Sequence, residues 1–335
     1  MADRVTLAQV ADEVGVSVMT VSNVLNGRPG ASEATRKRIK KVADRLGYTP
    51  NSAARNLKGG HTGLIGVVTL DLTTQYALEI VRGIADELAD AELEVLISAS
   101  YQDAIREYDR VDFLSRGVVD GIVLVAPVLA DRTIQLLKER GRPFIVVDPR
   151  QLDVKVPRVV VDNYGGMREA AQHLIDLGHK KIAFLRGAPD FESSATRYSG
   201  FVDAMKLAGL DTSAKLVAEC DFTYAFGFKA ATQIIKKEHP TAIVCGADVL
   251  ALGAVDAARA LGLSIPDDMS VIGFDDLPQA THSFPGLTTV RQPLHDMGQV
   301  AARALLGQID GTAPLMERMQ MPTSLVVRGT TARPH

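Results

Sequence analysis

Two short amphipathic segments open the chain, and a glycine joins them. In residues 5–26, apolar side chains recur every three or four positions, the spacing that places them on one face of a helix. Thr6 followed by Gln9 is the pattern of a capping box, and Gly15 supplies the backbone conformation that a sharp turn needs. Ser17 can cap the second helix. The pattern predicts a helix-turn-helix.

A third amphipathic segment follows, and it is strongly basic. Ser32 can cap its start, Ile39 and Leu46 lie on its apolar stripe, and Gly47 can end it. The run RKRIKK at residues 36–41 places five cations around one apolar position. Amphipathic helix pairs that bind nothing are common. Three such helices in the first fifty residues nevertheless favour a small DNA-binding unit.

A linker with helical spacing separates this unit from the rest of the chain. Pro50 breaks the pattern, residues 52–57 resume it, and Lys58-Gly59-Gly60 end it. A helix this short has no core of its own and cannot persist alone in water, because helix nucleation is costly. We therefore expect it to fold on DNA or against its copy in a dimer.

From Leu64 onward, short apolar runs alternate with helical patterns. Runs of the type found in buried parallel strands cover residues 64–70, 93–98, 121–126, 143–148, 181–185, 241–245 and 270–274. Helical patterns lie near residues 75–90, 104–116, 131–140, 164–177, 197–208, 225–237 and 248–261. This alternation predicts an α/β protein with two doubly wound parallel sheets.

Ligands of doubly wound sheets bind beyond the carboxyl ends of the strands. The charged residues that follow the predicted strands are Asp71, Asp148, Arg186, Asp248, Asp275 and Asp276. Any one of them could be a helix cap or a solvated loop charge. Because the strand ends of one sheet meet at one edge, their convergence predicts a polar ligand site.

Charge is distributed unevenly along the 335 residues. Residues 1–60 hold 10 Lys and Arg against 5 Asp and Glu, a balance of +5, whereas the remainder holds 27 against 35, a balance of −8. A basic segment on an acidic body predicts a polyanionic partner for the first segment alone. The length is enough for two or three domains with a sizeable core.

Several classes of protein are disfavoured. No apolar run approaches the roughly 18 residues of a membrane span, and the start of the chain lacks a signal pattern, so we expect a cytoplasmic location and no membrane partner. Cys220 and Cys245 are expected to be buried thiols and not metal ligands. Nucleophile-elbow, phosphate-loop, dinucleotide and zinc-protease motifs are absent from the sequence. We expect neither an enzyme nor a metal or cofactor.

Five sequence blocks resemble those of the LacI/GalR family of bacterial transcription regulators, in the family's order. They are VTLAQVADEVGVSVMTVSNVLNG, YTPNSAARNL, DNYGGMREAAQHLIDLGHKKIAFL, RYSGF, and IPDDMSVIGFDDLP with LTTVRQP. The resemblance implies a headpiece at residues 1–50, a hinge helix and linker at 51–60, and a periplasmic-binding-protein-like core. The core would comprise an N-subdomain of 61–161 plus about 291–320 and a C-subdomain of 162–290 plus about 321–335.

The resemblance also assigns DNA-contacting positions. It places Val18, Met19 and Asn23 against base edges, and Leu57, with Ala54 beside it, as a wedge in the minor groove. Phosphate and other DNA contacts fall on Thr6, Ser17, Thr20, Ser22, Asn26, Ser32, Thr35 and Asn51. Asn23 stands where an arginine is more usual, and asparagine favours adenine or a backbone contact.

In the core, the resemblance assigns effector contacts to Asp148, Ser193, Arg197, Phe222, Asp275 and Gln292. Asp71 and Asp248, which follow predicted strands, and Tyr76, at the mouth of the first sheet, are further expected contacts. Carboxylates and an arginine form paired hydrogen bonds with neighbouring hydroxyls, and an aromatic face covers a sugar ring, so the set suits a carbohydrate. Ala247-Asp248 stands where the family usually has Asn-Asp. Phe191 replaces an arginine of the purine-responsive branch, although Tyr76 keeps an aromatic ligand open.

These expectations describe a homodimeric repressor that binds a pseudo-palindromic operator under the control of a small molecule. The dimer face is expected near residues 75–90 and after Gln292, and the chain lacks a C-terminal leucine heptad that would favour a tetramer. The effector could be an inducer or a corepressor. A stand-alone sugar-binding protein and a nucleobase-responsive regulator are the alternatives.

Overall fold

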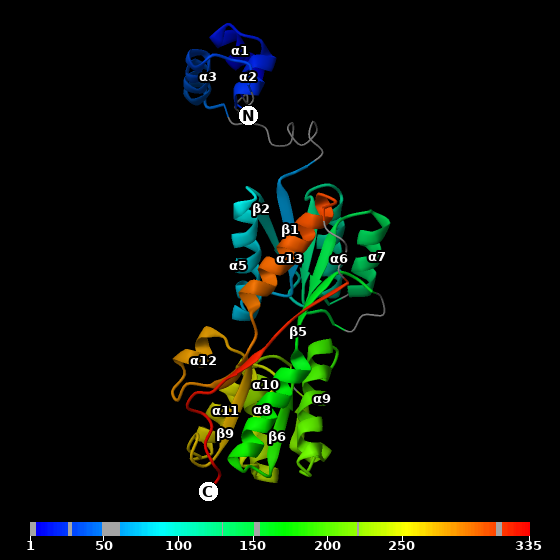
Figure 1. Ribbon diagram of the computed structural model, residues 1–335, viewed down its shortest axis with the longest axis vertical. Coiled ribbons are helices and arrows are strands. Elements are labelled where there is room, and N and C mark those ends of the chain that lie inside the picture. Colours follow the sequence, from blue (N-terminus) through cyan, green and yellow to red (C-terminus); the bar gives the residue numbers. More distant parts are fainter. Residues whose placement is uncertain are drawn as a thin grey trace. The chain divides into compact units, whose positions relative to one another are not determined.

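The computed structural model describes residues 5–25, 29–48, 61–128, 130–150, 155–219, 221–312 and 317–335. The chain divides into two compact units, Met1–Thr62 and Gly63–His335 (Figure 1). The predictions for the hinge helix and for Asn26, Asn51, Ala54 and Leu57 lie outside the described residues.

The first unit contains the predicted helices α1 (Leu7–Val14), α2 (Val18–Leu25) and α3 (Glu33–Leu46). Both halves of the Thr6–Gln9 capping box are present, and Gly15 has the left-handed φ of 73° that turns the chain toward α2. The three helices pack around an apolar core whose buried members are Val10, Ala11, Val14, Val21, Val24, Ile39 and Ala43. Local capping and this shared core together account for the fold of the unit.

In the second unit, the first sheet is parallel and has the order β11-β5-β4-β3-β1-β2. Its strands are β1 (Leu64–Thr69), β2 (Glu94–Ala99), β3 (Gly121–Val125), β4 (Phe144–Val147), β5 (Arg158–Val161) and β11 (Arg318–Met321). One face packs against α5 (Gln75–Asp90) and α13 (Leu294–Ile309), and the other against α6 (Ala104–Ser115) and α7 (Ala130–Glu139). We call this sheet with its helices the N-subdomain.

The second sheet has the order β12-β10-β9-β8-β6-β7. Its strands are β6 (Ile182–Arg186), β7 (Val217–Glu219), β8 (Ala242–Cys245), β9 (Ser270–Asp275), β10 (Thr288–Arg291) and β12 (Ser324–Val326). One face packs against α8 (Asn163–Leu177) and α9 (Glu192–Leu207), and the other against α10 (Tyr224–Glu238) and α11 (Asp248–Ala260). A short helix, α12 (Pro278–His282), follows β9. We call this sheet with its helices the C-subdomain.

Each predicted strand is present within one residue of its expected bounds. Strands β5, β7, β10, β11 and β12 and helices α12 and α13 were not predicted, and α9 begins at Glu192 instead of near residue 197. The predicted pair of doubly wound parallel sheets is confirmed, and the second sheet adds one antiparallel edge strand, β12 beside β10. That edge strand is only three residues long and partly exposed, so it lacks the buried apolar run from which a strand can be predicted.

The described chain passes from one sheet to the other after β5, after β10 and after β11 (Figure 1). Since β5 and β10 leave their sheets at their carboxyl ends, the carboxyl edges of both sheets face the boundary between the subdomains. Residues that end strands in either sheet therefore meet there. None of the helices that the structure describes combines the length and hydrophobicity of a bilayer crossing.

Candidate functional site

Helix α2 presents an outward face that is poor in hydrogen-bond donors. Val18 is 46% exposed and Met19 is 71% exposed, whereas Ser22 and Asn23 are half-buried. Ser17 caps the helix, because its Oγ accepts a hydrogen bond from the backbone nitrogen of Thr20 at 3.2 Å. The face can thus offer mainly apolar contacts to a partner.

Two arginine side chains of the basic helix α3 form hydrogen bonds within the first unit. Arg36 donates to the carbonyl oxygen of Ala31 at 3.3 Å, and Arg38 donates to the carbonyl oxygen of Val14. These bonds hold α3 against the preceding turn and α1. The exposed cations within the run are Arg38, Lys37, Lys40 and Lys41. The surface that can meet a polyanion is therefore smaller than the full run of five cations.

At the carboxyl edge of the N-subdomain, Tyr76 and Asp148 form one half of a polar cluster. The Tyr76 hydroxyl donates to Asp148 Oδ2 at 2.8 Å. Ser193, which belongs to α9 of the C-subdomain, also hydrogen-bonds the Asp148 carboxylate. Burial raises the pKa of Asp148, and burial together with the neighbouring Asp148 raises the pKa of Tyr76 well above its ordinary value. The two subdomains thus touch through this carboxylate.

The other half of the cluster surrounds Arg197, which is 3% exposed. Its Nε donates to Asn163 Oδ1 at 2.8 Å, and its Nη1 donates to the carbonyl oxygen of Gly246 at 2.6 Å. The guanidinium also lies 3.8 Å from the centre of the Phe274 ring. Arg197 is therefore locked in position before any ligand binds. Asn163, the first residue of α8, was not among the predicted site residues, although it stands only two positions after the end of β5.

Asp275 completes this half. Its Oδ1 accepts a hydrogen bond from Gln292 Nε2 at 2.6 Å and lies 3.9 Å from Arg197 Nη1. Burial raises the pKa of Asp275 to about 8; the charge of Asp248 acts in the same direction, and Arg197 opposes both. The carboxyl group can accept hydrogen bonds when ionised and can also donate one when protonated.

Asp248 is fully buried and holds the C-subdomain together. The backbone nitrogen of Leu277 donates a hydrogen bond to Asp248 Oδ2 at 2.8 Å, and the Thr289 hydroxyl donates one to Asp248 Oδ1 at 2.5 Å. Burial raises its pKa to about 6. Both oxygens of Asp248 are thus engaged within the protein, beside Asp275.

Two further predicted residues lie outside the cluster. Asp71 Oδ1 accepts the backbone hydrogen bonds of Thr73 and Thr74 at 2.8 Å each, which caps the turn before α5. Phe222 packs edge-on against Phe191, with ring centres 5.5 Å apart. The residues that the structure brings together are Tyr76, Asp148, Ser193, Arg197, Asp275 and Gln292.

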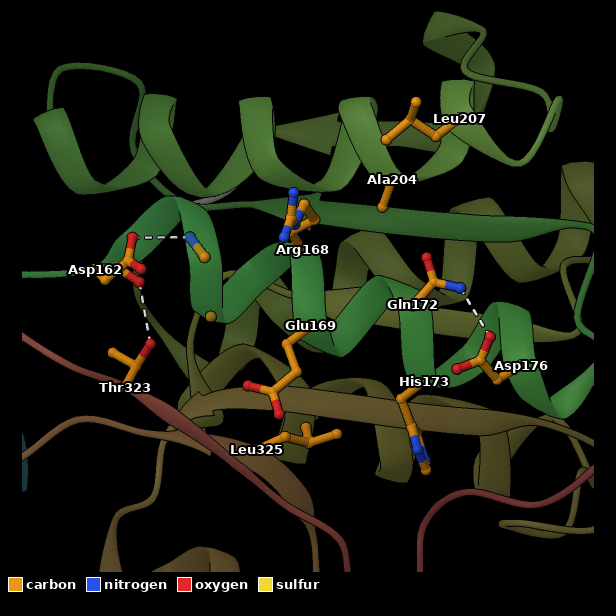
Figure 2. A pocket seen from close by; sticks show the side chains of 12 residues that line it. Asp162, Arg168, Glu169, Gln172, His173, Asp176, Ala204, Leu207, Thr323 and Leu325 are labelled. Atoms are coloured by element: carbon orange, nitrogen blue, oxygen red, sulfur yellow. Dashed lines mark hydrogen bonds between the residues drawn. The ribbon is translucent and has the colours of Figure 1, made fainter.

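A cavity of about 140 Å³ lies between the subdomains and is lined by Asp148, Asn163, Glu192, Ser193, Arg318 and Gln320, among others. A larger hollow of about 700 Å³ lies elsewhere, across α8 between the end of α9 and β12. Figure 2 shows it with Leu207 of α9 on one side of α8 and Leu325 of β12 on the other. None of the predicted effector contacts lines that larger hollow. We therefore place the candidate site at the buried polar cluster.

Comparison with known proteins agrees with this architecture. The model of the bacterial regulatory proteins of the lacI family matches residues 6–51, and that of a periplasmic binding protein-like domain matches residues 171–331. The HTH-type transcriptional regulator MalR of Streptomyces coelicolor is 36% identical over 336 residues, which cover 97% of this chain and 96% of the relative.

Solved structures give the same result. The transcriptional regulator CelR in complex with cellobiose has a TM-score of 0.74 at 32% identity, covering 98% of this chain and all of that one. The lac repressor dimer bound to operator and the anti-inducer ONPF has a TM-score of 0.89 at 29% identity, with the same coverage. Sequence and structure agree over nearly the whole length, and the chain belongs to the lacI family of bacterial regulatory proteins.

Proposed function

We propose that this chain is a homodimeric transcription regulator of the repressor type whose affinity for operator DNA changes when a small sugar binds between the subdomains. The observation that carries the sugar proposal is the buried polar cluster. Arg197 and Asp275 lie 3.9 Å apart, and Asp148 faces them from the other subdomain. A guanidinium and carboxylates held in this way suit the neighbouring hydroxyls of a sugar.

The DNA contacts belong to the same proposal. Val18 and Met19 are exposed apolar side chains on α2, and such side chains recognise the methyl group of thymine. Asn23 favours adenine or a phosphate. The capped starts of α2 and α3, with Ser17, Thr20, Ser32 and Thr35, suit phosphate groups because a helix start is electropositive. Thr6 and Ser22 complete the described set, and Ala54 and Leu57 remain proposals from the resemblance.

A sugar is favoured over a nucleobase by the surroundings of Phe191. Its ring is buried between the Arg150 guanidinium, 4.3 Å away, and Phe222. This apolar ring stands at the position where the resemblance would give a nucleobase-responsive regulator an arginine, so that polar contact to a base is missing. CelR, a structural relative, was solved with cellobiose. The nucleobase alternative rests on Tyr76, whose aromatic ring lies in the cluster and could stack on a base.

A thermal-shift screen tests the class of effector. Cellobiose, maltose, ribose and hypoxanthine would be added separately to the full-length protein, since a bound ligand raises the midpoint of unfolding by mass action. We expect at least one of the three sugars to raise the midpoint and hypoxanthine to leave it unchanged. A shift with hypoxanthine alone would replace the sugar proposal by the nucleobase alternative.

We also propose that the dimer face of the core includes α5 and α13. These helices pack closely, because Gly83 of α5 lies against the backbone of His295 in α13. Leu78 on α5 is 38% exposed, and Ile97 on the edge strand β2 is 42% exposed. Apolar side chains of this size gain free energy when a second copy covers them.

A further inference from the structure

Consecutive residues that lead into α9 are held by side chains of the N-subdomain. Asp190 forms an ion pair with Arg150, and the same guanidinium lies over the ring of Phe191. The backbones of Arg150 and Phe191 also form an isolated β-bridge. Two positions further on, Ser193 hydrogen-bonds Asp148. The start of α9 is thus attached to the opposite subdomain on both sides of Glu192.

Glu192 itself makes the most extensive of these attachments. Its Oε2 lies 3.1 Å from Arg158 Nη1, and its Oε1 lies 3.4 Å from Arg318 Nη1. The two arginines come from β5 and β11 of the N-subdomain, whereas Glu192 is the first residue of α9 in the C-subdomain. Each carboxylate oxygen therefore holds a different arginine across the boundary. We call this group of three residues the ionic latch.

The arginines of the ionic latch need an anion between them. Arg158 and Arg318 are register partners in the parallel pair β5–β11, so two cations stand side by side on neighbouring strands. Like charges at such positions repel. Glu192 compensates for that repulsion, and its side chain is only 28% exposed, with Arg158 at 22%. Charges that are partly withdrawn from water interact more strongly than exposed pairs do.

The ionic latch is next to the effector cluster. Glu192 directly precedes Ser193 in the chain, and Arg197 follows on the same helix. Glu192 and Arg318 also line the cavity of about 140 Å³ together with Asp148 and Ser193. A change in the latch would therefore move the helix that carries two of the proposed sugar contacts.

We propose that Glu192 is a positioning residue: through the ionic latch it holds the start of α9 against the N-subdomain and so sets the distance between the two halves of the effector cluster. Its role in effector binding rests on the proposed function, whereas the latch can be tested without an effector. When the latch is broken, the subdomains separate more often. An effector must then close them itself, which weakens its apparent affinity. Salt screens the latch and should have the same effect as its removal.

Single-molecule fluorescence energy transfer on the full-length protein tests this proposal. Donor and acceptor dyes would be attached through Lys138→Cys on α7 and Leu207→Cys on α9, both exposed, in a chain with Cys220→Ser. Labelled chains would be mixed with an excess of unlabelled ones so that each dimer carries one labelled copy. Neither sugar nor DNA is added, so the outcome does not depend on the proposed function.

The variant Glu192→Gln should raise the ratio of separated to closed molecules about fivefold at low salt. High salt should raise the ratio more in the unsubstituted protein than in the variant, in which the Asp190–Arg150 pair still responds to salt. Glu317→Gln is the matched control, because Glu317 pairs with Lys155 outside the latch and the same charge is lost. In an Arg158→Gln, Arg318→Gln background, Glu192→Gln should change the ratio less than twofold. An unchanged ratio in Glu192→Gln, or an equal change in Glu317→Gln, overturns the proposal.

Discussion

Aspartates at strand ends adopt backbone conformations that side chains usually avoid. Asp148 has a φ of 48°, Asp275 a φ of 131° and Asp276 a φ of 59°. A left-handed conformation costs about 1 to 3 kcal/mol for a residue with a side chain. At Asp276, ion pairs with Arg291 and Arg328, at 2.6 Å each, offset the cost of the left-handed backbone. Burial raises the pKa of both Asp148 and Asp275, and we take ligand binding as the reason why these two positions keep a strained backbone.

Because the pKa of Asp275 is raised in the folded protein, the free energy of unfolding should depend on pH. The folded state holds the proton up to a pH of about 8, whereas the unfolded chain releases it near a pH of about 4. Stability from this group is therefore complete below the lower value and is lost as pH rises through the upper one. Urea unfolding at several pH values should show the original protein losing stability relative to Asp275→Asn as pH rises. A pH-independent difference would contradict the assignment.

Gly187 should be required for the position of Phe222. A Cβ atom at Gly187 would lie 2.0 Å from Phe222 Cζ, so the ring would have to move. We expect Gly187→Ala to lower the free energy of unfolding by about 1 to 3 kcal/mol. In a Phe222→Ala background the same substitution should cost much less, because the clash is gone. Equal costs in both backgrounds, measured by urea unfolding, would show that the ring does not restrict this position.

At the scale of elements, Ser17 has a capping role and a proposed phosphate contact at the start of α2, and different substitutions can separate the two roles. Ser17 caps the helix in the structure, and we propose that it also meets a phosphate. Ser17→Ala should lower headpiece stability by about 1 kcal/mol. Ser17→Asp should keep the cap, since aspartate is an equally good one, but repel DNA.

The measurements for Ser17 are thermal unfolding and binding to nonspecific duplex DNA at low salt. Ser17→Asp should unfold close to the original temperature and bind the duplex at least tenfold more weakly. Ser32 caps α3 in the same way and is a second site for the pair of substitutions. If Ser17→Asp binds DNA as tightly as the original chain, the phosphate contact is absent.

Most of the strands with a continuous apolar run and most of the long amphipathic helices could be predicted from the sequence, and strands without such a run could not. Residues 75–90 show the helical spacing of α5 over four turns and were placed correctly. Strand β10, with the sequence TTVR, lacks a continuous apolar run, although its threonines are buried in the fold. Its burial is decided by packing and not by composition.

Only those parts of the candidate site that lie in recognisable sequence motifs could be predicted. Arg197 and Asp275 stand in motifs that resemble a family, and strand order brings them to one edge. Glu192 was not among the expected site residues, because its arginines lie 34 and 126 positions away in the sequence. A contact of that kind depends on how the two subdomains meet. Local sequence patterns carry no sign of it.

At the scale of the whole molecule, the proposed dimer face predicts a change in assembly. Leu78→Asp would place a charge on the exposed face of α5, where a second copy is proposed to pack. We expect the dimer dissociation constant to rise at least tenfold in sedimentation equilibrium. Leu207→Asp is the matched control, because Leu207 is 81% exposed at the end of α9 in the other subdomain. Equal behaviour of the two variants would place the dimer face elsewhere.

The central claim is that a sugar bound at the cluster of Arg197 and Asp275 changes the affinity of the protein for operator DNA. The most direct measurement is fluorescence anisotropy with a duplex selected from random DNA by the full-length protein, with and without the sugar found by thermal shift. We predict a change of at least tenfold in DNA affinity on adding the sugar. Arg197→Ala should bind the same duplex and show no change. A normal sugar response in Arg197→Ala would contradict the account.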